Sequence, residues 1–384
     1  MQQIGEKGGY YTVSFVGKII KELPPCAENN RNSEGDFIRM PDGSIAFAYT
    51  HYRNGGHQDS AVADLAVCFS YDEGESFTVP RIFLTAEECG NARNIMSVSL
   101  IEMLDGSIGV FYLKKFGELN CIPFFRTTRD FATFSDETCC FEKDAYLCLV
   151  NGRMRRLKNG NLILPLGGNI HPEEGPGGSY ENEGTWKYPP SQGIVVISKD
   201  DGKTFETTAI LDCPYEICMI PADRGLQEPG LEELDDGRIY LYFRNASGRQ
   251  LETYSSDGGY TWTPIMPSRF TSPPSPMSSL RMSDGNILVG YNPVPLYFGR
   301  GPKVDGVWTG GRTPYVLEIA DGNMNRIVAP RAIETDEKSG FGYCSMIEAK
   351  DGILLAYCAG GTHDPNMLAR MRIRKIPKNE LYPQ

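Results

Sequence analysis

The chain has 384 residues, with 38 Lys and Arg against 49 Asp and Glu, so its formal net charge is −11. No Lys- or Arg-rich run and no long apolar stretch occurs, which argues against a nucleic-acid partner and against a membrane span. An acidic chain can still contain a small basic pocket. The 42 Gly, 26 Pro, 20 Tyr and 18 Phe favour many turns and short strands, and no long amphipathic helix pattern is visible.

The N-terminal stretch MQQIGEKGGYYTVSFVGKII has neither an uninterrupted apolar core nor a small-residue cleavage site, so the sequence predicts no signal peptide. The 11 Cys are odd in number and lack metal-ligand spacing, which favours buried free thiols. The histidines lack metal-ligand spacing too; they are His51, His57, His171 and His363. We therefore expect a cytoplasmic protein, or a secreted one if an upstream leader has been removed, with no metal and no cofactor.

One pattern recurs along the chain: an apolar strand, a tight Asp-Gly or Asn-Gly turn, and a second, alternating strand. The turns lie at 42–43, 105–106, 159–160, 236–237, 284–285 and 351–352. These dipeptides are the strongest short hairpin signal, because both central residues can take positive φ. At roughly sixty residues apart, each hairpin has room to become a four-stranded sheet. Six such sheets arranged radially predict an all-β fold, a six-bladed β-propeller.

A second pattern, Ser-x-Asp-x-Gly-x-Thr/Ser-aromatic, alternates with the hairpins. It occurs as SYDEGESF (70–77), SKDDGKTF (198–205) and SSDGGYTW (255–262), with a weaker copy, TTRDFATF, at 127–134. We predict a turn that satisfies its own polar groups. The Ser and Asp side chains bond backbone groups, Gly takes positive φ, and the final aromatic packs beneath.

No linker composition divides the chain, so we predict one domain over residues 1–384. Closing a ring requires the two chain ends to share a sheet. Residues 10–20, YYTVSFVGKII, are expected to add a strand beside 368–377, LARMRIRKIP, in the last blade. Residues 170–185 are the least strand-like stretch and are expected to form a long polar loop.

Polar residues precede the otherwise apolar first strand of most hairpins. In a propeller the starts of the inner strands converge at one end of the central channel. The residues concerned are Arg31, Glu34, Asn94, Arg153, Gln227, Glu228 and Tyr343. Their density predicts a polar pocket on one face.

These repeats and candidate residues resemble the sialidase superfamily along the whole chain, and more closely its bacterial BNR-repeat branch. The second pattern resembles the Asp boxes of that superfamily, which lie away from the active face and are not catalytic. The resemblance implies three arginines that grip a sugar carboxylate, matched here by Arg31, Arg244 and Arg312. Arg31-Asn32-Ser33 stands where the family has Arg-Ile-Pro.

The resemblance also implies the reacting groups. Tyr343 matches the catalytic tyrosine, and Glu228, sixteen residues before Arg244, matches its base. Asp59 matches the loop acid/base, with Asp64 as the competing candidate. If these roles hold, the Tyr343 hydroxyl and a Glu228 oxygen lie within hydrogen-bond reach, at roughly 2.6–3.2 Å.

Physical chemistry accounts for these residue types. Guanidinium groups bind a carboxylate through charge-assisted, often bidentate hydrogen bonds. A tyrosine needs a nearby base to become a nucleophile, and a neutral phenol suits an anionic substrate better than a carboxylate nucleophile does. Each residue also has a structural explanation. The arginines can form surface ion pairs, Tyr343 can be a core residue, and Glu228 and Asp59 can serve turns.

The predicted function is that of a retaining exo-glycosidase that acts on a terminal acidic sugar, sialic acid being the simplest choice. A small glycan is the expected partner. The predicted catalytic residues are Asp59, Glu228 and Tyr343, and the predicted substrate-binding residues are Arg31, Arg244, Arg312, Glu34, Asn94, Arg153 and Gln227. One alternative is a uronate-specific lyase or hydrolase in which Tyr343 or His57 transfers the proton. Another is a carbohydrate-binding propeller without catalysis. His51 and His57 flank the Asp59 loop, where either can reach the pocket.

Overall fold

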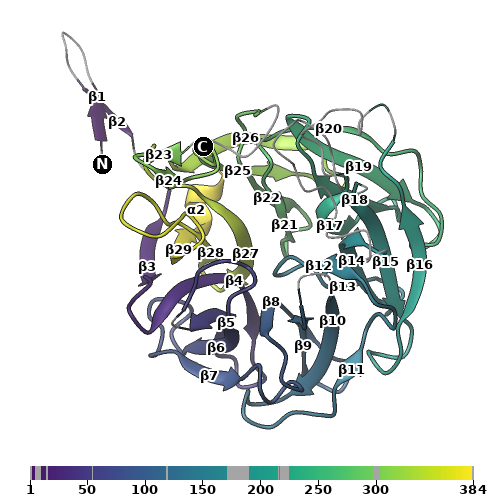
Figure 1. The fold of residues 1–384 in the computed structure, drawn as a ribbon. Helices are drawn as coiled ribbons and strands as arrows, with labels where there is room; N and C mark the ends of the chain where they lie inside the picture. The colour runs from purple at the N-terminus through teal and green to yellow at the C-terminus, as the bar shows by residue number, and fades with distance from the viewer. Residues whose placement is uncertain are drawn as a thin grey trace, which may run out of the picture.

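The computed structural model describes residues 2–4, 10–13, 16–53, 55–117, 120–170, 190–214, 216, 225–296 and 303–382. The fold is all-β, with its sheets arranged radially around a central axis like the blades of a propeller (Figure 1). One short helix, α2 (Lys378–Leu381), follows the last strand. No helix among the described residues is long and apolar enough to cross a membrane.

Four of the sheets contain four antiparallel strands each. The first sheet holds β4 (Asn29–Arg39), β5 (Ile45–Arg53), β6 (Ala63–Ser70) and β7 (Arg81–Leu84). The next two hold β17 (Gln227–Glu233), β18 (Ile239–Arg244), β19 (Arg249–Ser255) and β20 (Met266–Thr271), and then β21 (Ser278–Arg281), β22 (Ile287–Tyr291), β25 (Tyr315–Ala320) and β26 (Arg326–Glu334). The last holds β27 (Gly342–Ala349), β28 (Gly352–Cys358), β29 (Met371–Pro377) and β3 (Lys18–Leu23).

The second and third predicted hairpins share one nine-stranded sheet, so the prediction of six separate sheets is wrong for the described residues. Its strands are β8 (Asn94–Glu102), β9 (Ile108–Lys115), β10 (Cys121–Thr128), β11 (Thr138–Cys139), β12 (Tyr146–Cys148), β13 (Arg155–Arg156), β14 (Leu162–Asn169), β15 (Gln192–Ser198) and β16 (Glu206–Leu211). The joining strand is β12, which pairs with β10 in parallel and with β14 antiparallel. No sequence pattern marked this short strand.

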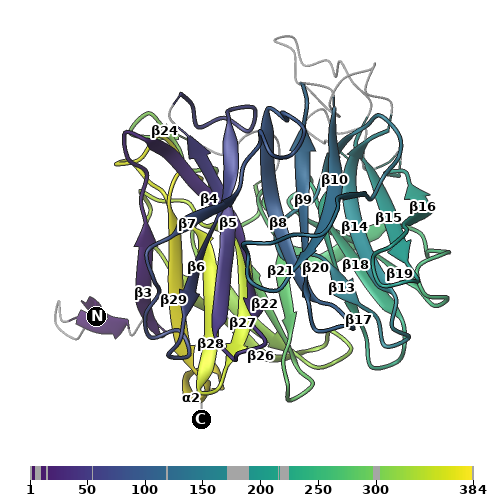
Figure 2. The ribbon, with the colours of Figure 1, turned by 90° about the horizontal axis from the view of Figure 1, so that it is seen from below.

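Two small hairpins account for the other strands in the described part of the chain: β1 (Gln2–Ile4) with β2 (Tyr10–Val13), and β23 (Lys303–Val304) with β24 (Val307–Trp308). The β1–β2 hairpin lies to the side of the propeller body (Figure 2). Because residues 10–13 belong to this hairpin, the ring-closing strand is β3, which begins at Lys18, eight residues later than the predicted start at residue 10. It pairs with β29 as the last strand of its sheet, so both ends of the chain meet there.

Five of the six Asp-Gly or Asn-Gly turns share a conformation that differs in one respect from the expectation. Only the Gly has positive φ, between 75° and 92°. The side chain of the preceding Asp or Asn accepts a hydrogen bond from the backbone N–H two residues later. At the sixth turn Gly352 already belongs to β28, and Ala349 pairs directly with it.

The three complete Asp boxes are built as predicted. In the first, Asp72 accepts from the Ser70 and Ser76 hydroxyls and from the Ser76 N–H, while the Gly74 N–H donates to Ser70. The other two boxes repeat this set of hydrogen bonds. The closing aromatics Phe77 and Phe205 pack against buried residues, which fastens each turn to its sheet.

The buried apolar residues form clusters between neighbouring sheets rather than one centre. One cluster joins β4 and β5 to β27, β28 and β29, and so packs the first sheet against the last. Two more cover opposite faces of the β14–β15 part of the nine-stranded sheet. Because strands such as β9, β14 and β28 are covered on both faces, they are buried along their whole length.

The ring closure generates a stability prediction. Ile373 of β29 is fully buried beside β3, and Ile327 of β26 is 50% exposed. Ile373→Ala should lower the free energy of unfolding by about 2–5 kcal/mol, because it removes burial and leaves a cavity. Ile327→Ala, the matched control, should cost less than about 1 kcal/mol. Urea unfolding followed by intrinsic fluorescence measures both, and equal costs would contradict the packing of β29 at the closure.

Candidate active site

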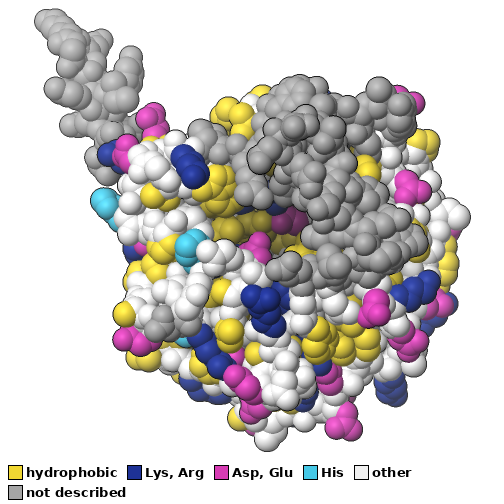
Figure 3. All heavy atoms as spheres, in the orientation of Figure 1, with side chains coloured by type: hydrophobic (Ala, Val, Ile, Leu, Met, Phe, Trp, Pro, Cys, Tyr) yellow, Lys and Arg dark blue, Asp and Glu magenta, His cyan; other side chains and the backbone are white. Residues whose placement is uncertain are grey.

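Four inner strands carry the same irregularity. Strands β8, β17 and β27 each shift register once against their partner strand, as at a β-bulge, and β4 does so twice. The second shift in β4, between Ser33 and Asp36, and the single shifts in the other three strands each hold one non-glycine residue at positive φ. In chain order these residues are Glu34, Ser97, Glu228 and Tyr343. All four stand nine residues before the Gly of their hairpin. Bulges re-aim side chains and gather at functional sites, so this constant offset marks a site near the axis. The face of the molecule that Figure 3 presents is hollowed near its centre.

Tyr343, Glu228 and Arg244 form one hydrogen-bonded group. The Tyr343 hydroxyl donates to Glu228 Oε1 at 2.7 Å, within the expected range, and accepts from Arg244 Nη1 at 3.2 Å. Arg244 Nη1 also donates to Glu228 Oε2 at 2.6 Å. Sheets that are far apart in sequence thus bring a phenol, a carboxylate and a guanidinium together.

The electrostatics of this group favour a neutral phenol beside a charged acceptor. Burial raises the pKa of the Tyr343 hydroxyl above its ordinary value, and the Glu228 carboxylate raises it further. Burial also raises the pKa of Glu228, but Arg244 and Arg312 outweigh that effect and hold it below its ordinary value. Glu228 is therefore a charged carboxylate that accepts the hydrogen bond of a neutral Tyr343 phenol.

Arg312 is a buried cation with unused donors. Its side chain is 1% exposed, and its one described hydrogen bond runs from Nη2 to the Pro274 carbonyl at 2.8 Å. Its Nε and Nη1 have no hydrogen-bond partner among the residues that the structure describes, although the Tyr343 hydroxyl is close enough to raise the pKa of Arg312. Burial, together with the charge of Arg244, lowers the pKa of Arg312. Buried charges are normally paired, so these free N–H groups suit an incoming anion.

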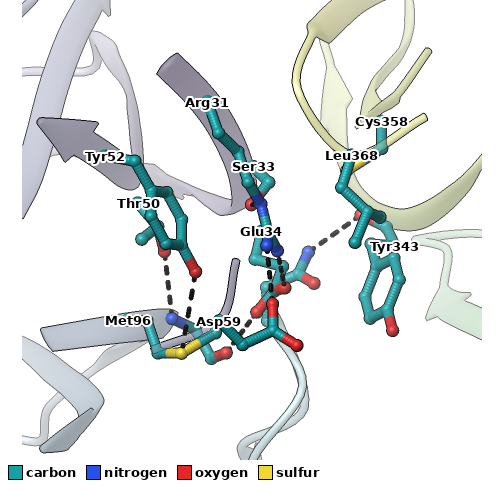
Figure 4. A network of polar contacts seen from close by, with 12 residues as sticks. Arg31, Ser33, Glu34, Thr50, Tyr52, Asp59, Met96, Tyr343, Cys358 and Leu368 are labelled. Carbon is teal, nitrogen blue, oxygen red and sulfur yellow. Dashed lines mark hydrogen bonds and ion pairs between the residues drawn. The ribbon is translucent and has the colours of Figure 1, made fainter. Parts of the chain in front are cut away.

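Arg31 is fully buried but well supplied with partners. Nε donates to the Ser33 hydroxyl at 2.8 Å, and Nη2 donates to Glu34 Oε1 at 2.8 Å. Nη1 donates to Asp59 Oδ1 at 2.6 Å and to the His57 carbonyl at 3.2 Å. Figure 4 shows the guanidinium pointing between the Glu34 and Asp59 carboxyls, with the Tyr343 side chain to their right.

Asp59 lies on the loop between β5 and β6, and its side chain is 60% exposed. Surrounding atoms partly desolvate the carboxyl, which raises its pKa, but the Arg31 guanidinium outweighs this, and Lys115 and Arg244 act in the same direction. The net result is a pKa below the ordinary value. The loop is held by its backbone, because Asn94 Nδ2 donates to the Asp59 and Ala61 carbonyls at 3.3 and 2.7 Å.

Glu34 sits deepest among these acids. It is 5% exposed and accepts hydrogen bonds from Arg31 and from the Ser97 hydroxyl. Burial raises its pKa to about 7, against the opposing effect of Arg31. The charges of Asp59 and Glu228 also raise the pKa of Glu34. Glu34 therefore interacts both with the Arg31–Asp59 pair and with the group formed by Tyr343, Glu228 and Arg244.

Two further predicted residues have structural surroundings. Arg153 is buried and donates to the Tyr242 hydroxyl, the Met277 carbonyl and the Ser278 hydroxyl, so it ties neighbouring sheets together. Gln227 precedes Glu228 on β17 and is half-buried. The substrate-binding role assigned to Arg153, Asn94 and Gln227 stays a prediction.

Sequence reasoning missed Ser97 and Lys115. Ser97 has the same nine-residue offset as Glu34, Glu228 and Tyr343, and that spacing was a usable signal. Lys115 ends β9 and donates to the Asp59 carbonyl, and no motif marked it. Of the two histidines beside the loop, His57 contributes its carbonyl to Arg31, and His51 contacts Asn29 at 2.7 Å. Within the described ranges, no cluster of His, Cys, Asp or Glu is arranged to hold a metal ion.

Comparison with solved structures identifies the class of fold. The NanB sialidase of Streptococcus pneumoniae superposes with a TM-score of 0.68 at 12% identity, over 96% of this chain and 72% of that one. A Trypanosoma rangeli sialidase in complex with sialic acid gives 0.63 at 13% identity, over 96% and 59%. A Dyadobacter fermentans protein of unknown function gives 0.67 at 15% identity, over 94% and 99%. The fold is therefore the sialidase-like propeller.

The family follows from the sequence comparison. Residues 105–355 match the BNR repeat-like domain, which is more than half of the chain, so this protein belongs to that family. The sialidase-like superfamily inferred from the hairpins and Asp boxes is confirmed. A comparison with curated protein sequences gives no match.

The pKa of Glu34 generates a pH prediction. A carboxyl whose pKa rises on folding binds more protons in the folded state, so its contribution to stability falls as pH rises from its unfolded pKa towards about 7. Glu34→Gln removes this loss. The melting temperature of the variant minus that of the wild type should therefore be more positive at pH 8 than at pH 5.5.

Glu73 provides the control. Arg39 lowers the pKa of Glu73 to about 2, so its charge state does not change between those pH values. The melting-temperature difference for Glu73→Gln should be the same at both. If Glu34→Gln behaves like Glu73→Gln, Glu34 does not titrate near neutrality.

Proposed function

We propose that this protein is a retaining exo-glycosidase of sialidase type, which hydrolyses a terminal acidic sugar, with sialic acid as the simplest candidate. The observation that carries the proposal is the Tyr343–Glu228–Arg244 group beside the unpaired N–H donors of Arg312. The group provides a nucleophile with its base, and Arg312 provides a binding site for an anion. The T. rangeli sialidase, seen in complex with sialic acid, has the same fold.

In the proposed reaction Asp59 protonates the glycosidic oxygen as the leaving group departs. The Tyr343 oxygen bonds to the anomeric carbon while Glu228 takes the phenolic proton. Asp59, now ionised, accepts a proton from water, whose oxygen attacks the anomeric carbon and releases Tyr343. Glu228 returns its proton to the tyrosine. Two displacements at one carbon retain the anomeric configuration.

We also propose that the nine-stranded sheet represents two propeller blades joined by β12, which makes six blades in all. Its two halves, β8–β10 and β13–β16, each contain one Asp-Gly or Asn-Gly hairpin. Separate apolar clusters on the two faces of β14 and β15 support this count, because each cluster fills one interface between neighbouring units.

A substrate screen tests the function together with Tyr343→Phe. The purified protein should release the fluorophore from sialosides, and not from neutral glycosides. Tyr343→Phe should abolish turnover and leave ligand binding nearly unchanged, because only the nucleophilic oxygen is lost. Tyr71→Phe, at a hydroxyl on the exposed surface, is the control and should keep wild-type activity.

Other outcomes of the screen point elsewhere. An unsaturated, ultraviolet-absorbing product from uronides would identify a lyase. Saturable sugar binding without turnover on any substrate would identify a binding propeller. An active Tyr343→Phe protein would exclude the covalent intermediate.

Arg312 gives a second test, of anion binding. Arg312→Lys should weaken the binding of an acidic sugar by at least about tenfold, because the planar fork of N–H donors is lost. Arg238→Lys is the matched control, since Arg238 pairs with Asp236 at an exposed hairpin turn. Isothermal titration with sialic acid measures both. Wild-type affinity in Arg312→Lys would remove Arg312 from the anion site.

A further inference from the structure

Arg31 cannot offer a bidentate edge to a ligand while both Asp59 and His57 are bound to it. A guanidinium has five N–H donors. Nε uses its one donor on Ser33, and Nη1 uses both of its donors, on Asp59 and on the His57 carbonyl. Nη2 donates one of its two N–H groups to Glu34. A carboxylate that bridges Nη1 and Nη2 must therefore displace either the Asp59 carboxylate or the His57 carbonyl from Nη1.

The Asp59 side chain is the partner best able to leave. Its carboxyl is 60% exposed and its one described hydrogen bond is to Arg31, whereas the carboxyl of Glu34 is buried and bonded to both Arg31 and Ser97. The Asp59 backbone carbonyl is fixed separately, by Asn94 and by Lys115 Nζ at 3.2 Å. The carboxyl can therefore turn away from Arg31 while the loop stays in place.

We propose that in the free protein the Asp59 carboxylate occupies the anion-binding site on Arg31, and that a ligand carboxylate displaces it. Ligand binding itself then prepares Asp59 to act as an acid. This inference rests on the proposed function for the identity of the ligand, an acidic sugar. It assigns Arg31 two successive anions rather than one.

The consequence for protonation follows from the surrounding charges. Several titratable or charged groups on the elements packed around Asp59 interact with its carboxyl electrostatically. They are Arg31 and Glu34 on β4, Tyr52 on β5, Lys115 on β9, Cys121 on β10, Tyr146 and Cys148 on β12, and Arg244 on β18. In the free protein the pKa of Asp59 is lowered, with Arg31 as the largest favourable charge. Pairing Arg31 with a ligand carboxylate removes that stabilisation and adds a negative neighbour, so the pKa of Asp59 rises and the carboxyl takes up a proton.

Isothermal titration calorimetry with sialic acid and with glucuronic acid tests the exchange without requiring turnover. The titrations are run at pH 5.5 in buffers of different ionisation enthalpy, which reports the protons taken up on binding. At this pH Glu34, with a pKa of about 7, is already protonated and adds no uptake. The wild type should take up a measurable fraction of a proton with the acid that binds.

Asp59→Asn and Asp59→Ala should bind that acid about two- to fivefold more tightly, because the displaced pair is partly exposed and such pairs contribute little. Both variants should lose the proton uptake. Asp105→Asn is the matched control, because Asp105 is similarly exposed, pairs with Arg129, and becomes an Asn-Gly turn like that at 159–160. It should match the wild type in affinity and uptake.

Unchanged or weaker binding in the Asp59 variants, or proton uptake that persists in them, overturns the exchange. Failure of both acids to bind the Asp59 variants also overturns it. If uptake and tighter binding occur but the substrate screen finds no hydrolysis, the exchange stands and the proposed glycosidase activity fails.

Discussion

The candidate site depends on one backbone constraint, the bulge shared by four inner strands. A non-glycine residue in the left-handed region costs on the order of 1–2 kcal/mol, so Glu34, Ser97, Glu228 and Tyr343 keep this conformation only because well-paired strands enforce it. A bulge turns one side chain out of the regular alternation. It is thus the device by which Tyr343 and Glu228, 115 residues apart in sequence, come into contact.

Buried charge sets the second constraint. Arg31 forms ion pairs with two carboxyls and Arg244 with one, whereas Arg312 forms none with the side chains that the structure describes. Because the pKa of Glu34 lies at about 7, this acid is neutral in mildly acidic solution. The site then holds three cations against Asp59 and Glu228, an excess of positive charge inside a protein of net charge −11. Anion affinity is therefore a local property that the overall charge conceals.

Local chemistry made much of this molecule predictable. The hairpin turns and Asp boxes satisfy their own hydrogen bonds, so their sequences alone indicate them. Residues set by packing across sheets were harder to predict. The strand β12, which merges two predicted sheets, has three residues and no turn signal. Arg153 precedes the strand β13, but its partners Tyr242 and Ser278 lie on other sheets, and no local sequence pattern indicates them.

The choice between Asp59 and Asp64 shows what spacing leaves undecided and what geometry adds. Asp64 is 3% exposed, accepts two hydrogen bonds from Arg53 at 2.5 and 2.8 Å, and accepts a third from the Ala86 N–H. A carboxyl held by three hydrogen bonds is fixed in place. An acid/base must gain and lose a proton and must therefore change partners, which suits an exposed carboxyl with one hydrogen bond. Asp59 meets that condition, and it does so because its loop is anchored through the backbone rather than through its own side chain.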